Sequence, residues 1–269
     1  MLVSSCIHIK TECKELRNLP SVCKVMMVGF PGKFRRYIME EYIVNKGKNE
    51  TIEVDGINYQ RLCIKTHIIT DKDSIVDVAV KYAKPLIKEN DTLFITEKIV
   101  GCCQGRAIPL SEIKPRKLAT FLSKFVLKTP YGIGLAMPET MEMALREVGT
   151  MKILFAAGIS AFGKVLGQRG WFYKIAGEKA RAIDGPCDCT IPPYNECVSL
   201  APLNPDEVAT EVSNAIGCDV IITDINDLGG NILGASSPKI DRDLFVKILK
   251  DNPLGQSDEQ TPMGIVRVS

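Results

Sequence analysis

The chain has 269 residues, of which 45% are hydrophobic and 25% are charged, a composition typical of a protein that folds around a sizeable core. This excludes extensive intrinsic disorder and a small scaffold held together by disulfides. The 34 Lys and Arg residues nearly balance the 32 Asp and Glu residues, and only 6% of residues are aromatic, so no nucleic-acid partner is expected.

The cysteines and the N-terminus indicate a reducing compartment. The 10 cysteines lack the regular spacing of a secreted scaffold, and the first residues show no signal-peptide pattern. We therefore expect free thiols in a cytoplasmic protein. The most apolar stretch, Ile153 to Gly163, is much shorter than the ~20 residues that a membrane-spanning helix needs. Cys187 and Cys189 have no second pair at zinc-site spacing, so no structural zinc is expected.

Regular structure is expected from Thr51 onward, after an N-terminal extension of residues 1–50. The alternating apolar residues on either side of Asp55-Gly56 predict a β-hairpin, because an Asp-Gly turn accommodates positive φ. The second strand of this hairpin is expected to continue to about Ile69.

Four helices and two strands should follow. Amphipathic spacing, prolines and caps predict helices from Thr70 or Asp71 to Pro85, from Pro115 to Pro130, from Pro138 to Gly149, and from Asn204 to Gly217. The second of these helices is expected to bury Leu118, Phe121, Leu122 and Phe125. Short apolar runs predict buried strands at Thr92 to Thr96 and at Val220 to Thr223. This alternation indicates a mixed α/β or α+β fold for residues 51–269.

A basic, glycine-rich segment at about 150–180 stands apart. Residues 152–181 hold six Lys and Arg residues against one Glu. We favour a helical insertion with solvated lysines, because the basic residues do not follow one helical face. Contact with a membrane surface through 152–181 is the less favoured alternative.

A phosphate loop is a second alternative in this segment. Gly158 to Lys164 matches the G-x-x-x-x-G-K pattern, but Val165 stands where such a loop needs Ser or Thr to hold magnesium. A phosphate-loop NTPase therefore stays as a rival hypothesis.

Acidic and amide residues near predicted turns could bind a divalent cation. Asp184 precedes Gly185-Pro186, Asp224 ends a buried strand, and Gln256 lies in a polar loop. Hard oxygen ligands of this kind suit Mg²⁺ or Mn²⁺. Asp224 is the strongest candidate, since α/β proteins bind ligands at the carboxyl ends of strands.

The segment that follows the strand at Thr92 to Thr96 could bind an anion. If a helix begins there, Lys98 could neutralise a phosphate, and Cys102 would share its helical face. Arg106 could add positive charge. With only two histidines in the chain, His67 is interpreted as a structural residue.

Six ordered segments together resemble the coenzyme F(420)-0 gamma-glutamyl ligase family, in its bacterial branch. They are Ile64–Thr70, Thr96–Arg106, Ala180–Pro186, Thr190–Asn195, Ile221–Asp227 and Asn252–Pro262. The resemblance implies an α+β fold that is not a phosphate-loop fold, an intertwined homodimer, and a ligase that uses GTP or ATP with Mg²⁺ or Mn²⁺.

The resemblance also implies a set of site residues. Asp184, Asp224 and Gln256 would be metal ligands, and Lys98 and Arg106 would be catalytic. The nucleotide would contact Thr66, His67, Ile68, Ile69, Glu97, Lys98, Cys187, Gly255, Gln256, Ser257, Asp258, Glu259 and Gln260. The sequence departs from the founding members at Cys102, where they have a nucleotide-contacting lysine, and at Ile225, where they have a metal-binding Thr.

The leading hypothesis is a metal- and nucleotide-dependent ligase that joins a carboxylate of a small-molecule acceptor to an amino acid, expected to be glutamate. A substrate carboxylate would be activated as an acyl phosphate and attacked by the amine. Besides the phosphate-loop rival, a non-catalytic nucleotide-binding or membrane-peripheral protein on the same fold stays open.

Overall fold

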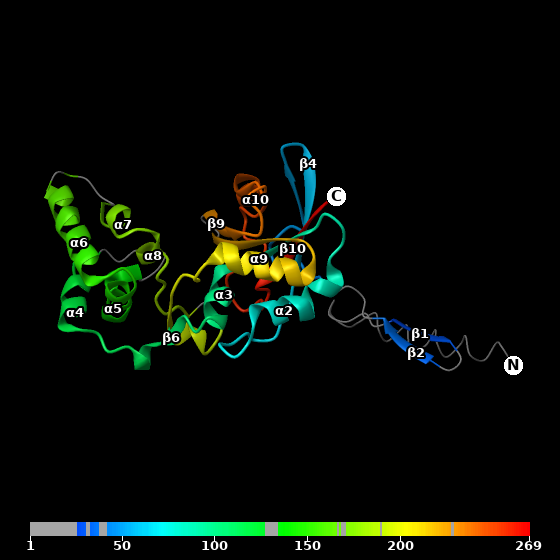
Figure 1. The fold of residues 1–269 in the computed structure, drawn as a ribbon, viewed down its shortest axis with the longest axis horizontal. Coiled ribbons are helices and arrows are strands. Elements are labelled where there is room, and N and C mark those ends of the chain that lie inside the picture. Colours follow the sequence, from blue (N-terminus) through cyan, green and yellow to red (C-terminus); the bar gives the residue numbers. More distant parts are fainter. Residues whose placement is uncertain are drawn as a thin grey trace. The chain divides into compact units, whose positions relative to one another are not determined.

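The computed structural model describes residues 26–30, 33–37, 42–126, 134–165, 167, 171–188, 190–226 and 229–269. The chain divides into two compact units, Met1–Ile43 and Val44–Ser269. The described part of the first unit is an antiparallel hairpin of β1 (Met26–Phe30) and β2 (Lys33–Tyr37). The second unit contains the expected site residues, and many of its elements are labelled in Figure 1.

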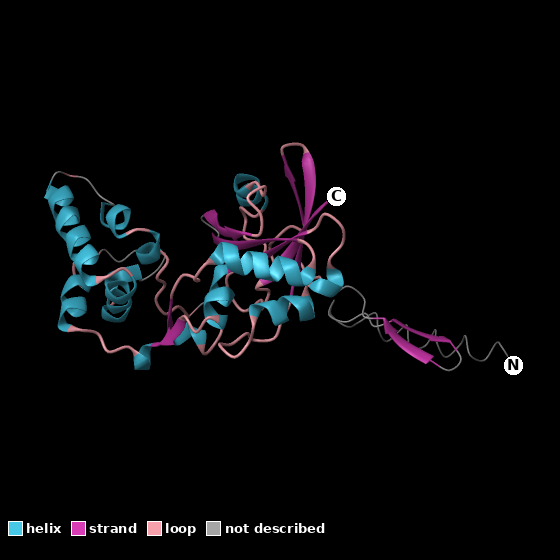
Figure 2. Cartoon of the chain, viewed as in Figure 1, coloured by secondary structure: helices cyan, strands magenta, loops and turns pink. Residues whose placement is uncertain are grey.

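A six-stranded sheet forms the core of the second unit, in the order β3-β4-β10-β5-β8-β9. Its strands are β3 (Thr51–Val54), β4 (Ile57–Ile64), β5 (Thr92–Thr96), β8 (Asp219–Asn226), β9 (Gly229–Ala235) and β10 (Met263–Val268). Only β5 and β8 run parallel, and the other neighbours are antiparallel. With helices around the sheet (Figure 2), the fold is mixed α and β, as the sequence predicted.

The hairpin expected around Asp55-Gly56 is confirmed. Asp55 and Gly56 both have positive φ, 52° and 80°, which a two-residue hairpin turn of this kind requires. The second strand ends at Ile64, however, and not at Ile69. Beyond it, the Thr66 N–H donates to the carbonyl of Gln260 at 3.0 Å, so the chain leaves the β10 ladder and contacts the loop that precedes β10.

Helices α2 (Ile75–Tyr82), α9 (Pro205–Ile216) and α10 (Arg242–Ile248) pack around the sheet. Helix α9 contacts α2, β8 and β9, whereas α10 contacts β9 and β3. Successive residues of a strand point to opposite faces. Phe94 of β5 and Ile221 of β8 therefore join Ile248 of α10 in one hydrophobic cluster, while the adjacent Leu93 and Ile95, also buried, point to the other face.

Two helix starts differ from the expected caps. The N-cap of α2 is Ser74, whose side chain accepts from the Asp77 N–H, so the expected cap at Thr70 or Asp71 is wrong. Asn204 precedes α9 as expected, but it is left-handed (φ 47°) and its side chain donates to Glu207 at 2.7 Å instead of capping a backbone N–H. Gly217 ends α9 with φ 85°, the left-handed conformation that favours glycine.

A helical cluster occupies the middle of the sequence. Its elements are α4 (Lys117–Ser123), α5 (Pro138–Glu147), α6 (Thr150–Val165), α7 (Trp171–Ala176) and α8 (Glu178–Arg181). Short β6 (Ala107–Pro109) and β7 (Cys197–Ser199) pair with each other, and β7 contacts α5. Buried Met141, Leu145 and Ile153 share one hydrophobic cluster with Val198 of β7.

Three expectations for this cluster are corrected. The described part of α4 ends well before Pro130, and it buries Ala119 and Leu122 while Phe121 and Phe125 stay exposed. The phosphate-loop alternative is also wrong, because residues 158–164 lie inside α6. Their backbone N–H groups bond within the helix and cannot cradle a phosphate.

The remaining short elements are 3-10 helices. They are η2 (Lys84–Leu86), η3 (Leu110–Glu112), η4 (Gly134–Ala136) and η5 (Tyr194–Glu196). Across the ranges that the structure describes, no helix combines the length and the apolar character needed to cross a membrane.

Candidate active site

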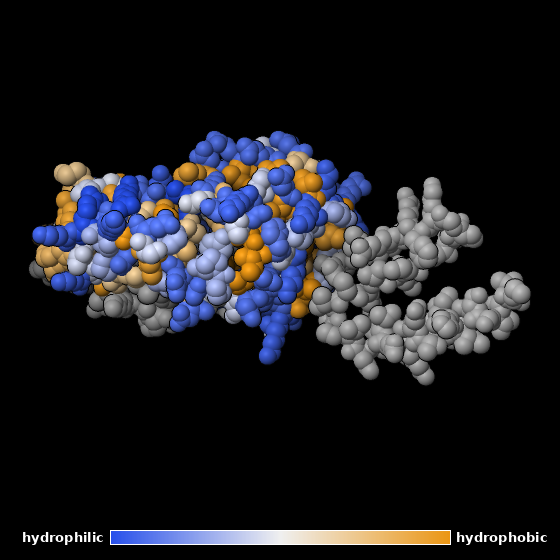
Figure 3. Space-filling view, turned by 90° about the horizontal axis from the view of Figure 1, so that it is seen from below, coloured by the Kyte–Doolittle hydropathy of each residue, from blue (hydrophilic) through white to orange (hydrophobic). Residues whose placement is uncertain are grey.

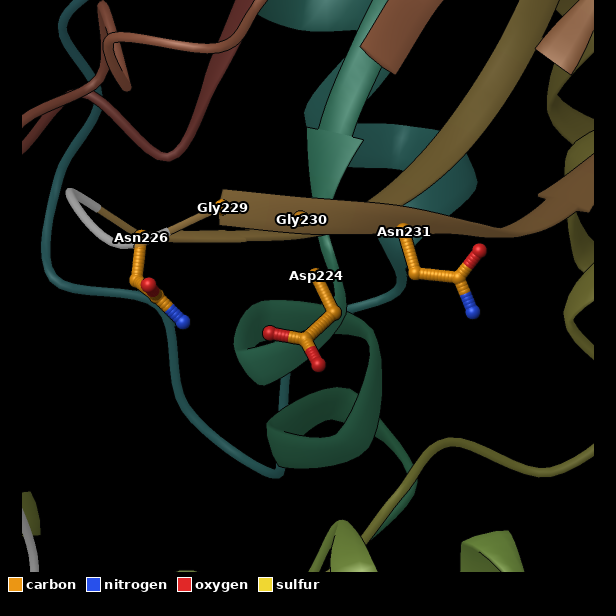
Figure 4. A pocket seen from close by; sticks show the side chains of 5 residues that line it. All are labelled: Asp224, Asn226, Gly229, Gly230 and Asn231. Carbon is orange, nitrogen blue, oxygen red and sulfur yellow. The ribbon is translucent and has the colours of Figure 1, made fainter. Parts of the chain in front are cut away.

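The parallel pairing of β5 and β8 creates the site. Thr96 is in register with Thr223, so the next residue on each strand, Glu97 and Asp224, emerges at the same edge of the sheet. Glu97 begins α3 (Glu97–Cys103) directly after β5. In Figure 4 the Asp224 carboxylate points toward the first turn of α3. Adjacent parallel strands thus bring two acids together at their carboxyl ends.

The strand that carries Asp224 is longer than expected. The strand continues to Asn226, so Asp224 lies within β8 and not after its last residue. There it is paired with Asn231 of β9. The carboxylate is half-buried. This pairing fixes the backbone of Asp224 more firmly than a turn would.

Asp184 reaches the same place from the helical cluster. It follows α8 and forms an isolated bridge with Ser199, with N–H to carbonyl distances of 3.0 Å and 2.9 Å. Its Oδ2 lies 3.2 Å from the Nζ of Lys98, the second residue of α3. The structure therefore brings Glu97, Lys98, Asp184 and Asp224 into one group, which we call the acidic cluster.

The acidic cluster holds more negative than positive charge. Glu97 is 7% exposed, and its Oε2 is buried without a hydrogen-bond partner. Burial raises the pKa of Glu97 to about 8, and the charges of Asp224 and Asp184 add to this. Burial and the charge of Asp184 likewise raise the pKa of Asp224. Glu97 and Asp224 are thus both destabilised as anions, by burial and by the neighbouring acids.

Lys98 is the counter-charge within the cluster. Burial acts to lower its pKa, but the charges of Asp184, Glu97 and Asp224 outweigh this effect and leave the pKa above its ordinary value. Lys98 therefore stays protonated, as a role in neutralising phosphate requires.

The segment of Thr66, His67, Ile68 and Ile69 lies against the same region. Cys102 of α3 donates from Sγ to the carbonyl of Ile69 at 3.5 Å, and the Thr96 N–H donates to the carbonyl of Pro262 at 3.0 Å. These contacts join α3 and the residue before it to two distant segments, which the bond from Thr66 to Gln260 connects to each other. Two expected nucleotide-contacting stretches are therefore neighbours.

The side chain of Glu259 holds the loop of residues 255–260 in place. The carboxylate of Glu259 lies against Gly255, where an added Cβ would clash with it, and accepts from the Ser257 N–H at 2.7 Å. Gln256, Ser257 and Asp258 are exposed. Among the contacts of the described residues, none joins Gln256 to Asp184 or Asp224, so the structure does not place this expected ligand in the acidic cluster.

His67 forms a small polar network of its own. Its Nδ1 is 2.9 Å from the hydroxyl of Tyr82, and its Nε2 is 3.1 Å from Oδ1 of Asp73. A hydrogen bond from the Thr70 backbone, followed by one from His67, lowers the pKa of Asp73. Both ring nitrogens of His67 are thus engaged, which agrees with a positioning role.

Arg106 and Cys187 have other partners. Arg106, which follows α3, pairs with Glu147 of α5 at 2.7 Å and donates to the carbonyl of Ala201, so its guanidinium contacts the helical cluster and not the acids. Cys187 is disulfide-bonded, so the expectation that all cysteines are free thiols is wrong for it. Among the cysteines that the structure describes, Cys63, Cys102, Cys103, Cys197 and Cys218 are free.

The structure adds residues of β9 that the sequence did not single out. An open hollow of about 260 Å³ is lined by Asp224, Asn226, Gly229, Gly230 and Asn231. Figure 4 shows the two asparagines on the same side of the hairpin as Asp224. Gly230 allows β9 to approach β8 closely, because a Cβ there would clash with Ile225. Only the pairing of β8 with β9 reveals this hollow, although Asn226 follows Asp224 closely in sequence.

The donor chemistry fits a divalent cation. Carboxylates and amide oxygens are the ligands of Mg²⁺ and Mn²⁺, and the unpartnered Oε2 of Glu97 is an available one. In the ranges described, no three acidic, His or Cys side chains already surround one point as ligands. Asp184 is instead paired with Lys98. The cluster therefore supplies suitable ligands without a preformed cage, as is usual for Mg²⁺ that keeps several waters.

The chain is thus a mixed α/β protein with acids at the carboxyl ends of two parallel strands. This is the place where α/β proteins bind their ligands. Comparison with protein-family models finds F420-0:Gamma-glutamyl ligase over residues 63–228, more than half of the chain. The chain belongs to this family, so the resemblance noted from the sequence is confirmed. A search of curated proteins finds no match. The matched residues include Glu97, Asp184 and Asp224.

Proposed function

We propose that this chain is a nucleotide- and divalent-metal-dependent ligase that forms an amide bond between a small-molecule carboxylate and an amino acid, with glutamate as the expected amino acid. Membership of a gamma-glutamyl ligase family supports the reaction class. The single observation that carries the metal and nucleotide part is the acidic cluster, where a buried carboxylate oxygen without a partner faces two further acids.

Glu97, Asp184 and Asp224 are the proposed metal-holding residues. Bringing three carboxylates together raises their mutual repulsion, which a cation relieves. The chemistry that Mg²⁺ or Mn²⁺ supplies in such a site is neutralisation of charge on a phosphoryl group. Gln256 stays a proposed ligand only if its exposed loop moves toward the cluster on binding.

Lys98 is the proposed nucleotide-neutralising residue. Its Nζ is paired with Asp184, with both side chains about half exposed, so the ammonium can turn from the carboxylate to an incoming phosphate. It sits one turn before Cys102, the position at which the founding members have lysine. Thr66 to Ile69 and Gly255 to Gln260 are proposed to contact GTP or ATP, since Ile69 contacts α3 and Gln260 is bonded to Thr66.

The proposed reaction has two steps. The terminal phosphoryl group of the nucleotide is transferred to an oxygen of the substrate carboxylate, and the nucleoside diphosphate leaves. The amine nitrogen of the amino acid then attacks the acyl carbon, phosphate leaves, and the amine gives up a proton. Lys98 would balance phosphoryl charge in the first step. A homodimer is part of the proposal on family grounds alone.

Thermal melts with and without Mg²⁺ plus GTP or ATP test this proposal. We expect the wild-type melting temperature to rise with the metal–nucleotide pair, and the rise to be largely lost in Asp224→Asn. Asp243→Asn is the matched control, because Asp243 is exposed on α10, and it should respond like the wild type. An equal rise in all three proteins would refute the assignment of Asp224.

A second experiment tests catalysis. Isotopically labelled glutamate, nucleotide and Mg²⁺ are incubated with the protein and a small-molecule extract, and new labelled products are sought by mass spectrometry. A labelled amide that depends on both nucleotide and Lys98 supports the ligase. Nucleotide binding without any labelled product would favour the non-catalytic alternative.

A further inference from the structure

Helix α6 exposes an apolar face that the proposed ligase reaction does not use. Its exposed large side chains recur three, four and seven residues apart, which places them along one side of a helix. They are Met151 (79% exposed), Leu154 (38%), Phe155 (63%) and Phe162 (60%). The opposite side of α6 is anchored, because Ile153 and Ala156 are fully buried. The helix is therefore firmly seated and still presents an apolar stripe to solvent.

Helix α4 and the residues just after it add two further aromatic side chains to the same helical cluster. Phe121 and Phe125 are 57% and 60% exposed, and their ring centroids lie 5.0 Å apart in an edge-to-face contact. Arg116, the N-cap of α4, donates to the hydroxyl of Thr150, the first residue of α6, at 3.5 Å, so the two helices begin next to each other. We call the exposed side chains of the two helices together the apolar face.

The segment of the sequence that carries the apolar face is strongly basic. Residues 114–181 contain 12 Lys and Arg residues and 4 Glu residues, a net charge of +8, although the whole chain carries only +2. The remaining residues therefore carry −6. Exposed lysines of the helical cluster include Lys117, Lys124, Lys152, Lys174 and Lys179. In Figure 3 hydrophilic and apolar surface lie side by side over the part that Figure 1 labels α4 and α6.

The acids of the helical cluster do not offset this charge at the surface. Glu142 is buried and paired with Arg116 at 3.0 Å and Arg146 at 2.9 Å. Glu147 is paired with Arg106. Two of the four acids are thus paired with arginines inside the fold.

We propose that the apolar face of α4 and α6 docks on an anionic lipid surface. Exposed aromatic and aliphatic side chains on one side of a helix, flanked by lysines, are the arrangement with which amphipathic helices lie in the interface of a bilayer. Anionic headgroups attract such lysines, whereas a second copy of the same face would bring +8 against +8. The charge therefore favours lipid over self-association.

The attachment is peripheral and does not depend on the proposed ligase function. No helix among the described residues could span the bilayer, so binding must be reversible and sensitive to salt. The acidic cluster is formed by β8, α3 and the segment after α8, none of which contributes to the apolar face.

Vesicle sedimentation tests the proposal with the full chain. Vesicles of phosphatidylcholine alone are compared with vesicles containing 30% phosphatidylserine, at 50 mM and 500 mM salt. We expect at least tenfold tighter binding to the anionic vesicles at low salt, and loss of that preference at high salt. Equal binding to both vesicles, or none to either, would overturn the proposal.

Two matched variants distinguish binding through the apolar face from non-specific hydrophobic binding. Phe155→Ser with Phe162→Ser removes two exposed rings from α6 and should weaken vesicle binding at least tenfold. Ile57→Ser with Val268→Ser removes two exposed apolar side chains from the sheet and should leave binding unchanged. Unchanged melting temperatures show that both variants fold. A wild-type dimer that becomes a monomer in the α6 variant, with no vesicle binding by either protein, would assign the face to self-association and overturn the proposal.

Discussion

Glu97→Gln should stabilise the protein at neutral pH when no metal or nucleotide is present. Glu97 is buried beside Asp224 and Asp184, and its pKa lies at about 8 against an ordinary 4.5. Between these two values the folded state keeps a proton that the unfolded state has released. Stability therefore falls as the pH rises through this window.

Proton linkage gives the magnitude of this effect. A carboxyl whose pKa rises from 4.5 to about 8 on folding lowers the free energy of unfolding by about 3 kcal/mol at pH 7, and by less than ~1 kcal/mol at pH 5. Gln has nearly the same shape and no charge, so Glu97→Gln should recover most of this difference. In a chain of this size that corresponds to an increase in melting temperature of about 6–12 °C at pH 7.

Urea denaturation at pH 5, 7 and 8 measures the prediction. Glu211→Gln is the matched control, because Glu211 is exposed on α9 and its substitution should change little at any pH. If Glu97→Gln were no more stable than wild type at pH 7, or gained equally at pH 5 and pH 7, the electrostatic account of the acidic cluster would be wrong. The expected result is that the stability gain of Glu97→Gln grows with pH and that the variant no longer responds to Mg²⁺ plus nucleotide. Such a result agrees with a site whose buried acid lowers stability and is needed for ligand binding.

Three further predictions concern the framework around the site. Arg267→Ala should lower the free energy of unfolding, measured by urea denaturation, by about 3–5 kcal/mol. The reason is that the fully buried Asp91 carboxylate loses the guanidinium that lies 2.7 Å away. A loss below ~1 kcal/mol would contradict this. Gly234→Ala should destabilise by about 1–3 kcal/mol, because a Cβ there clashes with the backbone of Pro205, and a neutral effect in the same assay would show that α9 can shift. Cys63 should resist thiol reagents in the folded protein at pH 8, because burial raises its pKa to about 12; labelling as fast as in urea would refute this.

Some local structure follows from the sequence by itself. The Asp55-Gly56 turn, the apolar run at Thr92 to Thr96 and the end of α9 at Gly217 were all predicted correctly. Each depends on backbone preferences and hydrophobic spacing within a few residues, which the chain carries wherever it lies. Family membership also follows from the sequence, because it rests on ordered motifs.

The site required long-range contacts that local patterns do not contain. Glu97 and Asp224 meet because β5 pairs with β8 in parallel, and Asp184 joins them only through Ser199 and Lys98. The sequence indicated that Asp184 and Asp224 could bind a metal and that Glu97 could contact a nucleotide, but it could not show that Glu97 is buried without a partner. Burial and pKa depend on which distant groups surround a side chain.

The exposure of apolar residues was likewise decided by tertiary structure. Spacing alone predicted that Phe121, Leu122 and Phe125 are buried, yet of these only Leu122 is buried, while Phe121 in α4 and Phe125 just after it are exposed. Helical periodicity identifies an apolar side but not the neighbour that covers it. In α6, Ile153 meets the rest of the helical cluster, whereas Phe155 is left in solvent, because a helix that is apolar all round can bury only the side that its neighbours contact.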